Sequence, residues 1–178
     1  MNASALPKRL TVIDLAKEDM KFSAGHFTIF SATDRERLHG HNFSVGARIT
    51  CAVGDDGMAF DYGIYKKKLH GLCRAWNEYF ILPTQSPYLE IRENGDRVEA
   101  VFDGVSIPFL RSDILLLPIA NATLEEFSRL MLEALIVDPA EIEKYGVWAL
   151  TVRVSSGPGQ SAATSWSRLD EKANAFGE

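Results

Sequence analysis

The stretch LHGHNF, Leu38 to Phe43, decides how this chain is organised, because it holds His39 and His41 two residues apart. Side chains along a β-strand repeat every two residues, so a strand here projects both imidazoles from one face. Upstream, FSAGHF carries His26, and the polar segment between the two stretches is short enough for the first strand to fold back beside the second. Three converging imidazoles without a fourth protein ligand are typical of a catalytic zinc site with one open coordination position.

An H-x-H pair alone also occurs in strands that bind no metal. The zinc interpretation is favoured because three of the four histidines of the chain fall in this window. The fourth, His70, lies in a lysine-rich helical segment, where we expect it to be solvated.

Length and composition predict a single domain over residues 1–178 with a sizeable core. The formal charge is −5 and there is no block of lysine and arginine, which argues against nucleic acid or an anionic membrane as a partner. No apolar run approaches the ~20 residues that span a bilayer, and the N-terminus lacks the apolar region of a signal peptide. These features predict a cytoplasmic protein, and its two cysteines, Cys51 and Cys73, are expected to be reduced and buried.

The hydrophobic pattern predicts two strands followed by a helix. Met20 to Phe30 reads as the first strand, and His39 to Val53 as a long second strand with one apolar face that the histidines continue. Asp61 is placed to cap a helix that runs to about Tyr79, with a buried stripe at three- and four-residue spacing.

The second half predicts an inserted three-stranded meander, at about residues 82–118, ahead of a second helix. Asn94-Gly95 and Asp103-Gly104 are turn signals between short β segments. Thr123 is expected to cap the second helix, with Glu126 completing a capping box. Two strands close the chain, at 147–154 and 162–169, between a loose N-terminal arm and a frayed tail from Asp170. This order predicts an α+β fold with both helices on one face of an antiparallel sheet.

Four pieces, in this order, resemble the 6-pyruvoyltetrahydropterin synthase family, which includes 6-carboxytetrahydropterin synthase. They are FSAGHF, LHGHNF, the G-x-x-F-D-Y-G run from Gly57 to Gly63, and T-x-E from Thr123 to Glu125. The resemblance implies a tunnelling fold: an antiparallel four-stranded sheet backed by two helices. It also implies zinc bound by His26, His39 and His41, homo-oligomers that are commonly hexamers, and active sites between subunits.

The same resemblance implies a small-molecule substrate, dihydroneopterin triphosphate, whose side chain carries vicinal oxygens. Zinc in an open site polarises such oxygens as a Lewis acid. A nearby base then takes a proton, and either triphosphate is eliminated or a carbon–carbon bond breaks by a retro-aldol route.

The chain departs from the family pattern at three places. Arg35 stands where the family usually has a catalytic cysteine. The next residue, Glu36, is similar to the glutamate that replaces this cysteine in one subgroup, which makes Glu36 the candidate base. The alternative is that Glu36 is an exposed charge in a charged loop. Asn77-Glu78 replaces the Asp-His pair, which leaves Glu78 as the candidate for a rebuilt proton relay. Ser155 or Ser156 stands where a glutamate holds the pterin ring. Serine cannot supply the charged, bidentate acceptor that a guanidine-like ring edge favours.

Three functions remain open on this basis. The first is a zinc-dependent pterin lyase of the glutamate subgroup, with substrate-binding residues Thr123, Glu125, Ser155 and Ser156 and a pocket rebuilt by Glu125, Glu126 or the inserted hairpins. The second is the same lyase or aldolase chemistry on a non-pterin substrate. The third is a silent relative whose zinc only stabilises an oligomer, which an open three-ligand site argues against, since structural zinc usually has four protein ligands.

Overall fold

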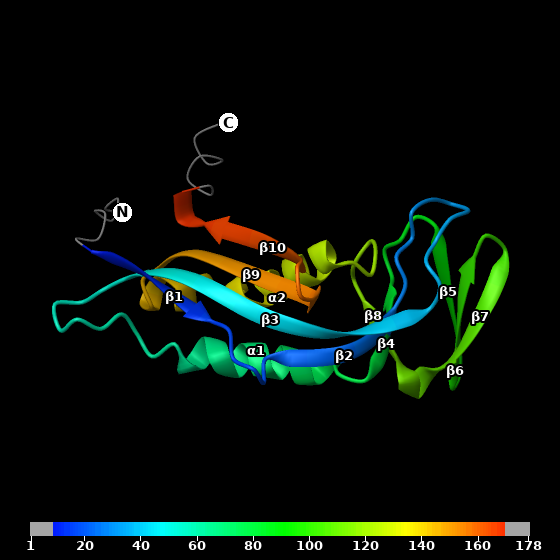
Figure 1. The fold of residues 1–178 in the computed structure, drawn as a ribbon, viewed down its shortest axis with the longest axis horizontal. Helices are drawn as coiled ribbons and strands as arrows, with labels where there is room; N and C mark the ends of the chain where they lie inside the picture. Colours follow the sequence, from blue (N-terminus) through cyan, green and yellow to red (C-terminus); the bar gives the residue numbers. More distant parts are fainter. Residues whose placement is uncertain (1–8, 170–178) are drawn as a thin grey trace.

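The computed structural model describes residues 9–169; the predicted N-terminal arm up to Lys8 and the tail from Asp170 lie outside these residues. Figure 1 shows a long twisted sheet with helices along it and a smaller sheet at one end. Within the described residues the larger sheet is formed by β1 (Leu10–Leu15), β2 (Lys21–His26), β3 (His39–Ala52), β4 (Tyr79–Pro83), β8 (Ile114–Leu117), β9 (Val147–Gly157) and β10 (Gln160–Ser167). The smaller sheet is formed by β5 (Leu89–Asn94), β6 (Arg97–Phe102) and β7 (Val105–Leu110). The helices are α1 (Gly63–Trp76), α2 (Leu124–Ile136), α3 (Pro139–Lys144) and the short 3-10 turn η1 (Arg111–Asp113).

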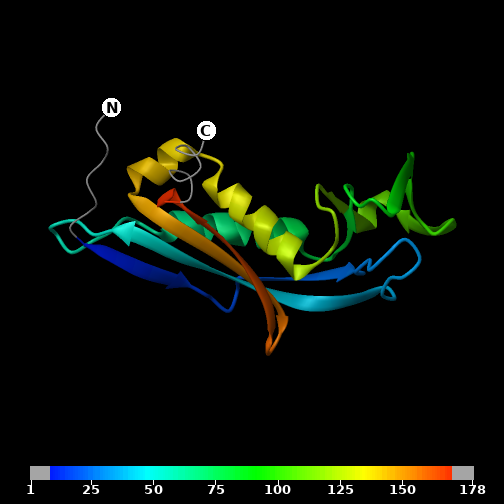
Figure 2. The same ribbon diagram turned by 90° about the horizontal axis from the view of Figure 1, so that it is seen from above.

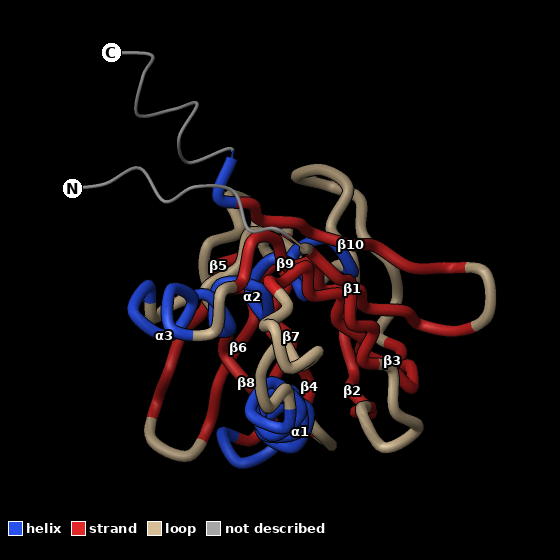
Figure 3. The backbone as a smooth tube through the Cα atoms, turned by 90° about the vertical axis from the view of Figure 1, so that its left-hand side faces the viewer, coloured by secondary structure: helices blue, strands red, loops and turns tan. Residues whose placement is uncertain are grey.

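The predicted α+β fold is confirmed. Its centre is the antiparallel run β10-β9-β3-β2, and α1 and α2 both cover one face of it (Figure 2). Seen end-on in Figure 3, the three α-helices lie on one side of β1, β2 and β3. The sheet continues beyond the four expected strands, because β4 joins β2 and β8 joins β4, both in parallel.

The strands β1 and β2 follow one another along the same edge of β3. β2 pairs with the first part of β3, where His26 lies opposite His39, and β1 pairs with the last part, where Leu10 lies opposite Ala52. The predicted end of the first strand at Phe30 is wrong. After His26 the chain leaves the sheet, because the amides of Thr28 and Ile29 donate to side chains rather than to a neighbouring strand.

The core lies between the sheet and the helices. α1 contributes Tyr65, Leu69 and Trp76, and α2 contributes Phe127 and Met131, all buried. The predicted boundaries of the first helix are wrong by a few residues: the chain is already extended at Asn77, and Tyr79 begins β4. Asp61 is not the residue that caps α1 but lies one position earlier, where its carboxylate accepts a hydrogen bond from the Gly63 amide at 2.9 Å.

The cap of the second helix is confirmed, since Thr123 Oγ1 accepts from the Glu126 amide at 3.5 Å. The reciprocal half of the capping box is wrong. The Glu126 carboxylate instead accepts from the Ala120 amide at 3.1 Å and from Arg129 at 2.9 Å. The inserted meander is confirmed as β5-β6-β7, with Gly95 and Gly104 at the two turns in the left-handed conformation that glycine favours. The sequence reasoning missed α3, where Asp138 caps the helix and Pro139 begins it.

Candidate metal centre

The three histidines meet where β2 ends and β3 begins, beneath the N-terminus of α2. The pairing of β2 with β3 sets Ala24 opposite His41 and His26 opposite His39, so alternation along both strands turns the three rings to the helix side of the sheet. Their ring centroids are 4.5 to 5.3 Å apart, and their ligand nitrogens lie within 4.8 Å of one another. The predicted triad is thus brought together as a group that can hold a metal ion.

The hydrogen bonds of two rings leave their Nε2 atoms free for a metal. His26 Nδ1 lies 2.7 Å from the Ala122 carbonyl oxygen, and His39 Nδ1 lies 2.8 Å from that of Arg37, so each Nδ1 carries the proton and donates it. His26 Nε2 is buried and has no hydrogen-bond partner in the described part of the chain. A buried acceptor left without a partner costs free energy, and a bound metal ion removes that cost.

Burial also favours the neutral imidazole that a metal requires. Desolvation lowers the pKa of His26 by more than its bond to Ala122 raises it, and the neighbouring His39 and His41 lower it further. The nitrogen-only donor set and the held Nδ1 atoms fit zinc. The rings rest on Phe43 and Phe127, whose centroids lie 5.6 and 6.2 Å from that of His26.

Glu36 lies beside this triad. Its Oε2 is 3.8 Å from His39 Nε2 and accepts a hydrogen bond from the Thr28 amide at 2.9 Å. Burial raises the pKa of Glu36, but the hydrogen bonds from Thr28 and the charges of His39 and His26 together lower it below its ordinary value. The carboxylate is therefore ionised near neutral pH and can accept a proton.

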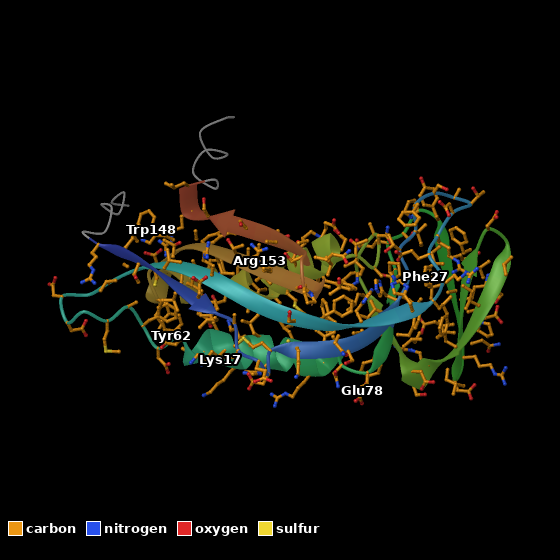
Figure 4. All side chains as sticks on the ribbon, in the orientation of Figure 1. Lys17, Phe27, Tyr62, Glu78, Trp148 and Arg153 are labelled. Carbon is orange, nitrogen blue, oxygen red and sulfur yellow. The ribbon has the colours of Figure 1, made fainter. Side chains whose placement is uncertain are left out.

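Glu78 lies outside the group formed by Glu36 and the three histidines. It is exposed at the end of α1 with a positive φ of 67° and lines an open groove of about 640 Å³ together with Ser23, Asn42 and His41. Figure 4 labels Glu78 at the margin of the molecule. No hydrogen bond or ion pair joins its side chain to the histidines among residues 9–169.

The two candidate serines lie near the end of β9, next to the turn into β10. Val154 is buried on the helix side, and Ser155 follows it on the other face. The β9–β10 register shifts at Ser156, because Gln160 pairs with Gly157 and Ser161 pairs with Ser155. The Ser155 hydroxyl is used within the β9–β10 turn, 2.7 Å from the Gly157 carbonyl oxygen and 2.8 Å from that of Gln160.

The N-terminus of α2 contributes both to the triad and to its surroundings. Ala122 holds His26, and Thr123 follows it as the cap of the helix. Glu125 is exposed in the first turn of α2, and its carboxylate forms no ion pair or hydrogen bond in the described part of the chain, whereas Glu126 is occupied by Ala120 and Arg129.

Sequence reasoning missed two groups that hold this site together. The Asn121 side chain accepts from the Ile29 amide at 3.0 Å and donates to the Ile29 carbonyl at 2.8 Å, which ties the loop after β2 to the start of α2. The second is the Ala122 carbonyl, and a backbone oxygen has no signature in a sequence. An asparagine two residues before a predicted helix cap was the one signal available for Asn121.

Comparisons with known proteins agree with this geometry. A family model described as 6-pyruvoyl tetrahydropterin synthase matches residues 15–165. The 6-pyruvoyl tetrahydropterin synthase of Plasmodium falciparum is 27% identical with a TM-score of 0.84, covering 89% of this chain and 98% of its own. That of Plasmodium vivax is 29% identical with a TM-score of 0.84, covering 90% and 99%. A P. vivax variant with alanine in place of a glutamate described as a catalytic residue is 28% identical, with a TM-score of 0.84 and coverage of 90% and 99%. A search of curated protein sequences found no match.

Proposed function

Because the chain belongs to the 6-pyruvoyl tetrahydropterin synthase family, we propose that it is a zinc-dependent lyase acting on dihydroneopterin triphosphate or a related pterin. The reaction is an elimination of triphosphate or a retro-aldol cleavage, with Glu36 as the base. The observation that carries this proposal is the approach of the Glu36 carboxylate to within 3.8 Å of an imidazole nitrogen of the triad.

His26, His39 and His41 are the residues that would hold the zinc. When bound, zinc supplies Lewis acidity that polarises the substrate oxygens and makes an adjacent proton easier to remove. The chain itself orients two of the ligands, because the carbonyl oxygens of Ala122 and Arg37 accept hydrogen bonds from Nδ1–H of His26 and His39.

The Glu36 carboxylate is suited to take the proton, because the Thr28 amide fixes Oε2 and favours the ionised form. The P. vivax relative supports this role, since a glutamate of that enzyme is described as a catalytic residue. Glu36 here occupies the loop directly before the H-x-H pair.

The substrate-binding residues proposed are Thr123 and Glu125 at the start of α2 and Ser155 and Ser156 at the end of β9. Glu125 has the stronger support, because its carboxylate forms no ion pair or hydrogen bond in the described part of the chain. Thr123 and Ser155 already use their hydroxyls in a helix cap and a turn. Glu78 is the proposed proton relay, because Asn77-Glu78 stands at the position of the Asp-His pair in the family pattern.

We further expect a homo-oligomer, and a hexamer is the proposed form. Within the described residues β10 and β8 are the outer strands of the large sheet, and unpaired strand edges are sites where another chain can pair. In the part of the chain that the structure describes, no helix is long and apolar enough to cross a membrane. The proposed location is the cytoplasm. Sedimentation velocity of the purified protein measures whether it forms the proposed hexamer.

The deciding experiment is incubation of the zinc-loaded protein with dihydroneopterin triphosphate, followed by mass analysis of the products. We expect consumption by the wild type and its loss in Glu36→Gln, with Glu90→Gln as a matched control, because Glu90 is exposed on the meander and pairs with Arg92. Without consumption by the wild type the pterin assignment is wrong. The non-pterin substrate would then be favoured, in agreement with the use of the Ser155 hydroxyl inside its own turn. Zinc-dependent assembly without any turnover would instead indicate the silent relative.

A further inference from the structure

The inserted meander β5-β6-β7 packs onto the loop that carries Glu36. A buried cluster separate from the main core joins Phe27 and Ile29 of that loop to Val98, Ala100 and Phe102 of β6. Leu82, Leu89 and Ile114 complete the cluster, so β4, β5 and β8 also contribute to it. Figure 4 labels Phe27 at the end of the molecule where the meander lies. The meander therefore covers residues that stand next to the metal centre.

Arg35 connects this apolar cluster to Glu36. Its guanidinium carbon lies 5.0 Å from the ring centroid of Phe27 and 5.5 Å from that of Phe102, so the planar cation stands between a ring of the loop and a ring of the meander. The same guanidinium donates from Nη1 to the Glu36 carbonyl oxygen at 2.7 Å. Arg35 is half-buried and therefore partly desolvated, which strengthens both contacts.

With this bond, Glu36 is held at three points. Its amide donates to the Thr28 carbonyl oxygen at 2.9 Å, its Oε2 accepts from the Thr28 amide at 2.9 Å, and its carbonyl accepts from Arg35. Thr28 holds the amide end and the carboxylate, whereas the carbonyl end depends on Arg35 alone among these contacts. A shift of the carbonyl end would turn the side chain away from His39.

We propose that Arg35 is a positioning residue for Glu36 and that the inserted meander, through Phe102, is the support that holds Arg35 in place. The inference rests on the proposed function, since it requires Glu36 to be the base. It assigns a role to the residue at the position of the missing cysteine: Arg35 turns into the apolar cluster and orients the carboxylate that follows it.

The test compares turnover of dihydroneopterin triphosphate by zinc-loaded Arg35→Met, Arg35→Lys and Phe102→Leu with that of the wild type. Arg35→Met keeps the length and the apolar stem but removes the planar cation and the donor. We expect kcat to fall about ten- to a hundredfold with little change in KM, since small displacements of a catalytic group have effects of this size. Arg35→Lys and Phe102→Leu should lose less. Arg92→Met, an exposed arginine on the same meander, should leave kcat unchanged.

A merely structural role is separated by combining Arg35→Met with Glu36→Gln. If Arg35 acts through Glu36, the double variant is no slower than Glu36→Gln alone, because the base that Arg35 positions is already absent. Multiplicative losses in the double variant, or a loss in Arg35→Met that follows lost zinc or a lowered melting temperature, would overturn the inference.

The failure of this inference differs from the failure of the proposed function. Full activity of Arg35→Met beside an inactive Glu36→Gln overturns the positioning role alone. If the wild type consumes no substrate, the positioning role is tested by comparing the Glu36 carboxylate in crystal structures of the wild type and Arg35→Met. Departure of the Glu36 carboxylate from the Thr28 amide in the variant supports the positioning role, and a carboxylate that stays within about 0.5 Å overturns it.

Discussion

Gly25 lies in β2, directly before His26, and replacing it with alanine should weaken both the fold and the metal site. A Cβ at this position would lie 2.4 Å from Phe80 Cδ2 and 3.0 Å from Cε2, where ordinary contacts are 3.4–4 Å. Phe80 has little room to move, because its ring packs 4.9 Å from Phe109 and 6.1 Å from Phe27. The strain must therefore be relieved by moving β2 relative to β4.

The magnitude follows from two opposing effects. Overpacking by about 1 Å in a packed site typically lowers the free energy of unfolding by about 1–3 kcal/mol. Alanine also reduces the conformational entropy of the unfolded chain, which raises the free energy of unfolding by about 0.4–1 kcal/mol. The expected net loss in the free energy of unfolding is about 1–2 kcal/mol. With a urea dependence of about 2 kcal/mol/M, the unfolding midpoint falls by about 0.5–1 M. Since His26 follows Gly25 directly, zinc should bind about tenfold more weakly.

Two assays test this prediction: urea unfolding, and zinc titration against a chelator. The protein concentration is kept fixed, because the apparent stability of an oligomer depends on it. Gly71→Ala in α1 is the matched control: its Cβ would meet nothing within 4 Å, so it should stabilise by about 0.5–1 kcal/mol. Adding Phe80→Leu to Gly25→Ala should restore part of both losses. An unchanged midpoint and zinc affinity in Gly25→Ala would refute the reasoning.

Three further outcomes are expected. His39→Ala should lower zinc affinity more than the ~10–100-fold that supporting residues cost. His70→Ala should keep the zinc, because His70 lies on α1 with its ring 3.5 Å from Asp19 Oδ2; metal analysis measures both. The hydrogen bond from Arg129 lowers the pKa of Glu126 below its ordinary 4.5 by more than burial raises it. The Glu126–Arg129 pair therefore stabilises the protein above that pH, and this stabilisation is lost as the pH falls through the folded-state pKa. Acid unfolding of Glu126→Gln should lack this loss of stability. Burial raises the pKa of the Cys73 thiol to about 11, so a thiol reagent at pH 8 should react with it only after unfolding in guanidinium chloride.

The histidine triad could be predicted from the sequence because it depends mainly on the two-residue alternation of side chains along a β-strand. Alternation in β3 turns His39 and His41 to one face, and the short loop leaves few registers in which His26 can approach them. The cap of α2 by Thr123 was predicted for a similar reason, since side chain and amide stand three residues apart. Both features are encoded within a few residues of chain.

The parts that could not be predicted depend on contacts between distant segments. Ala122 reaches His26, and Asn121 reaches Ile29, across more than ninety residues, and neither contact follows from residue type. The parallel addition of β4 and β8 was also missed, because pairing of a short apolar strand with β2 rather than with the meander is decided by packing. The helix end was placed too late at Tyr79 because the positive φ of Glu78, which redirects the chain into β4, has no signal in a residue other than glycine or asparagine.

The metal ligands and the proposed base are held by different parts of the fold. The histidines depend on the β2–β3 register and on the Ala122 and Arg37 carbonyls. Glu36 depends on Thr28 and on Arg35, which in turn needs the Phe102 ring of the inserted meander. A cysteine at position 35 would have neither the guanidinium that bridges the two rings nor the donor to the Glu36 carbonyl. If Glu36 is the base, its position therefore depends on the packing of β5-β6-β7 against the loop, whereas the positions of the metal ligands depend on the β2–β3 register.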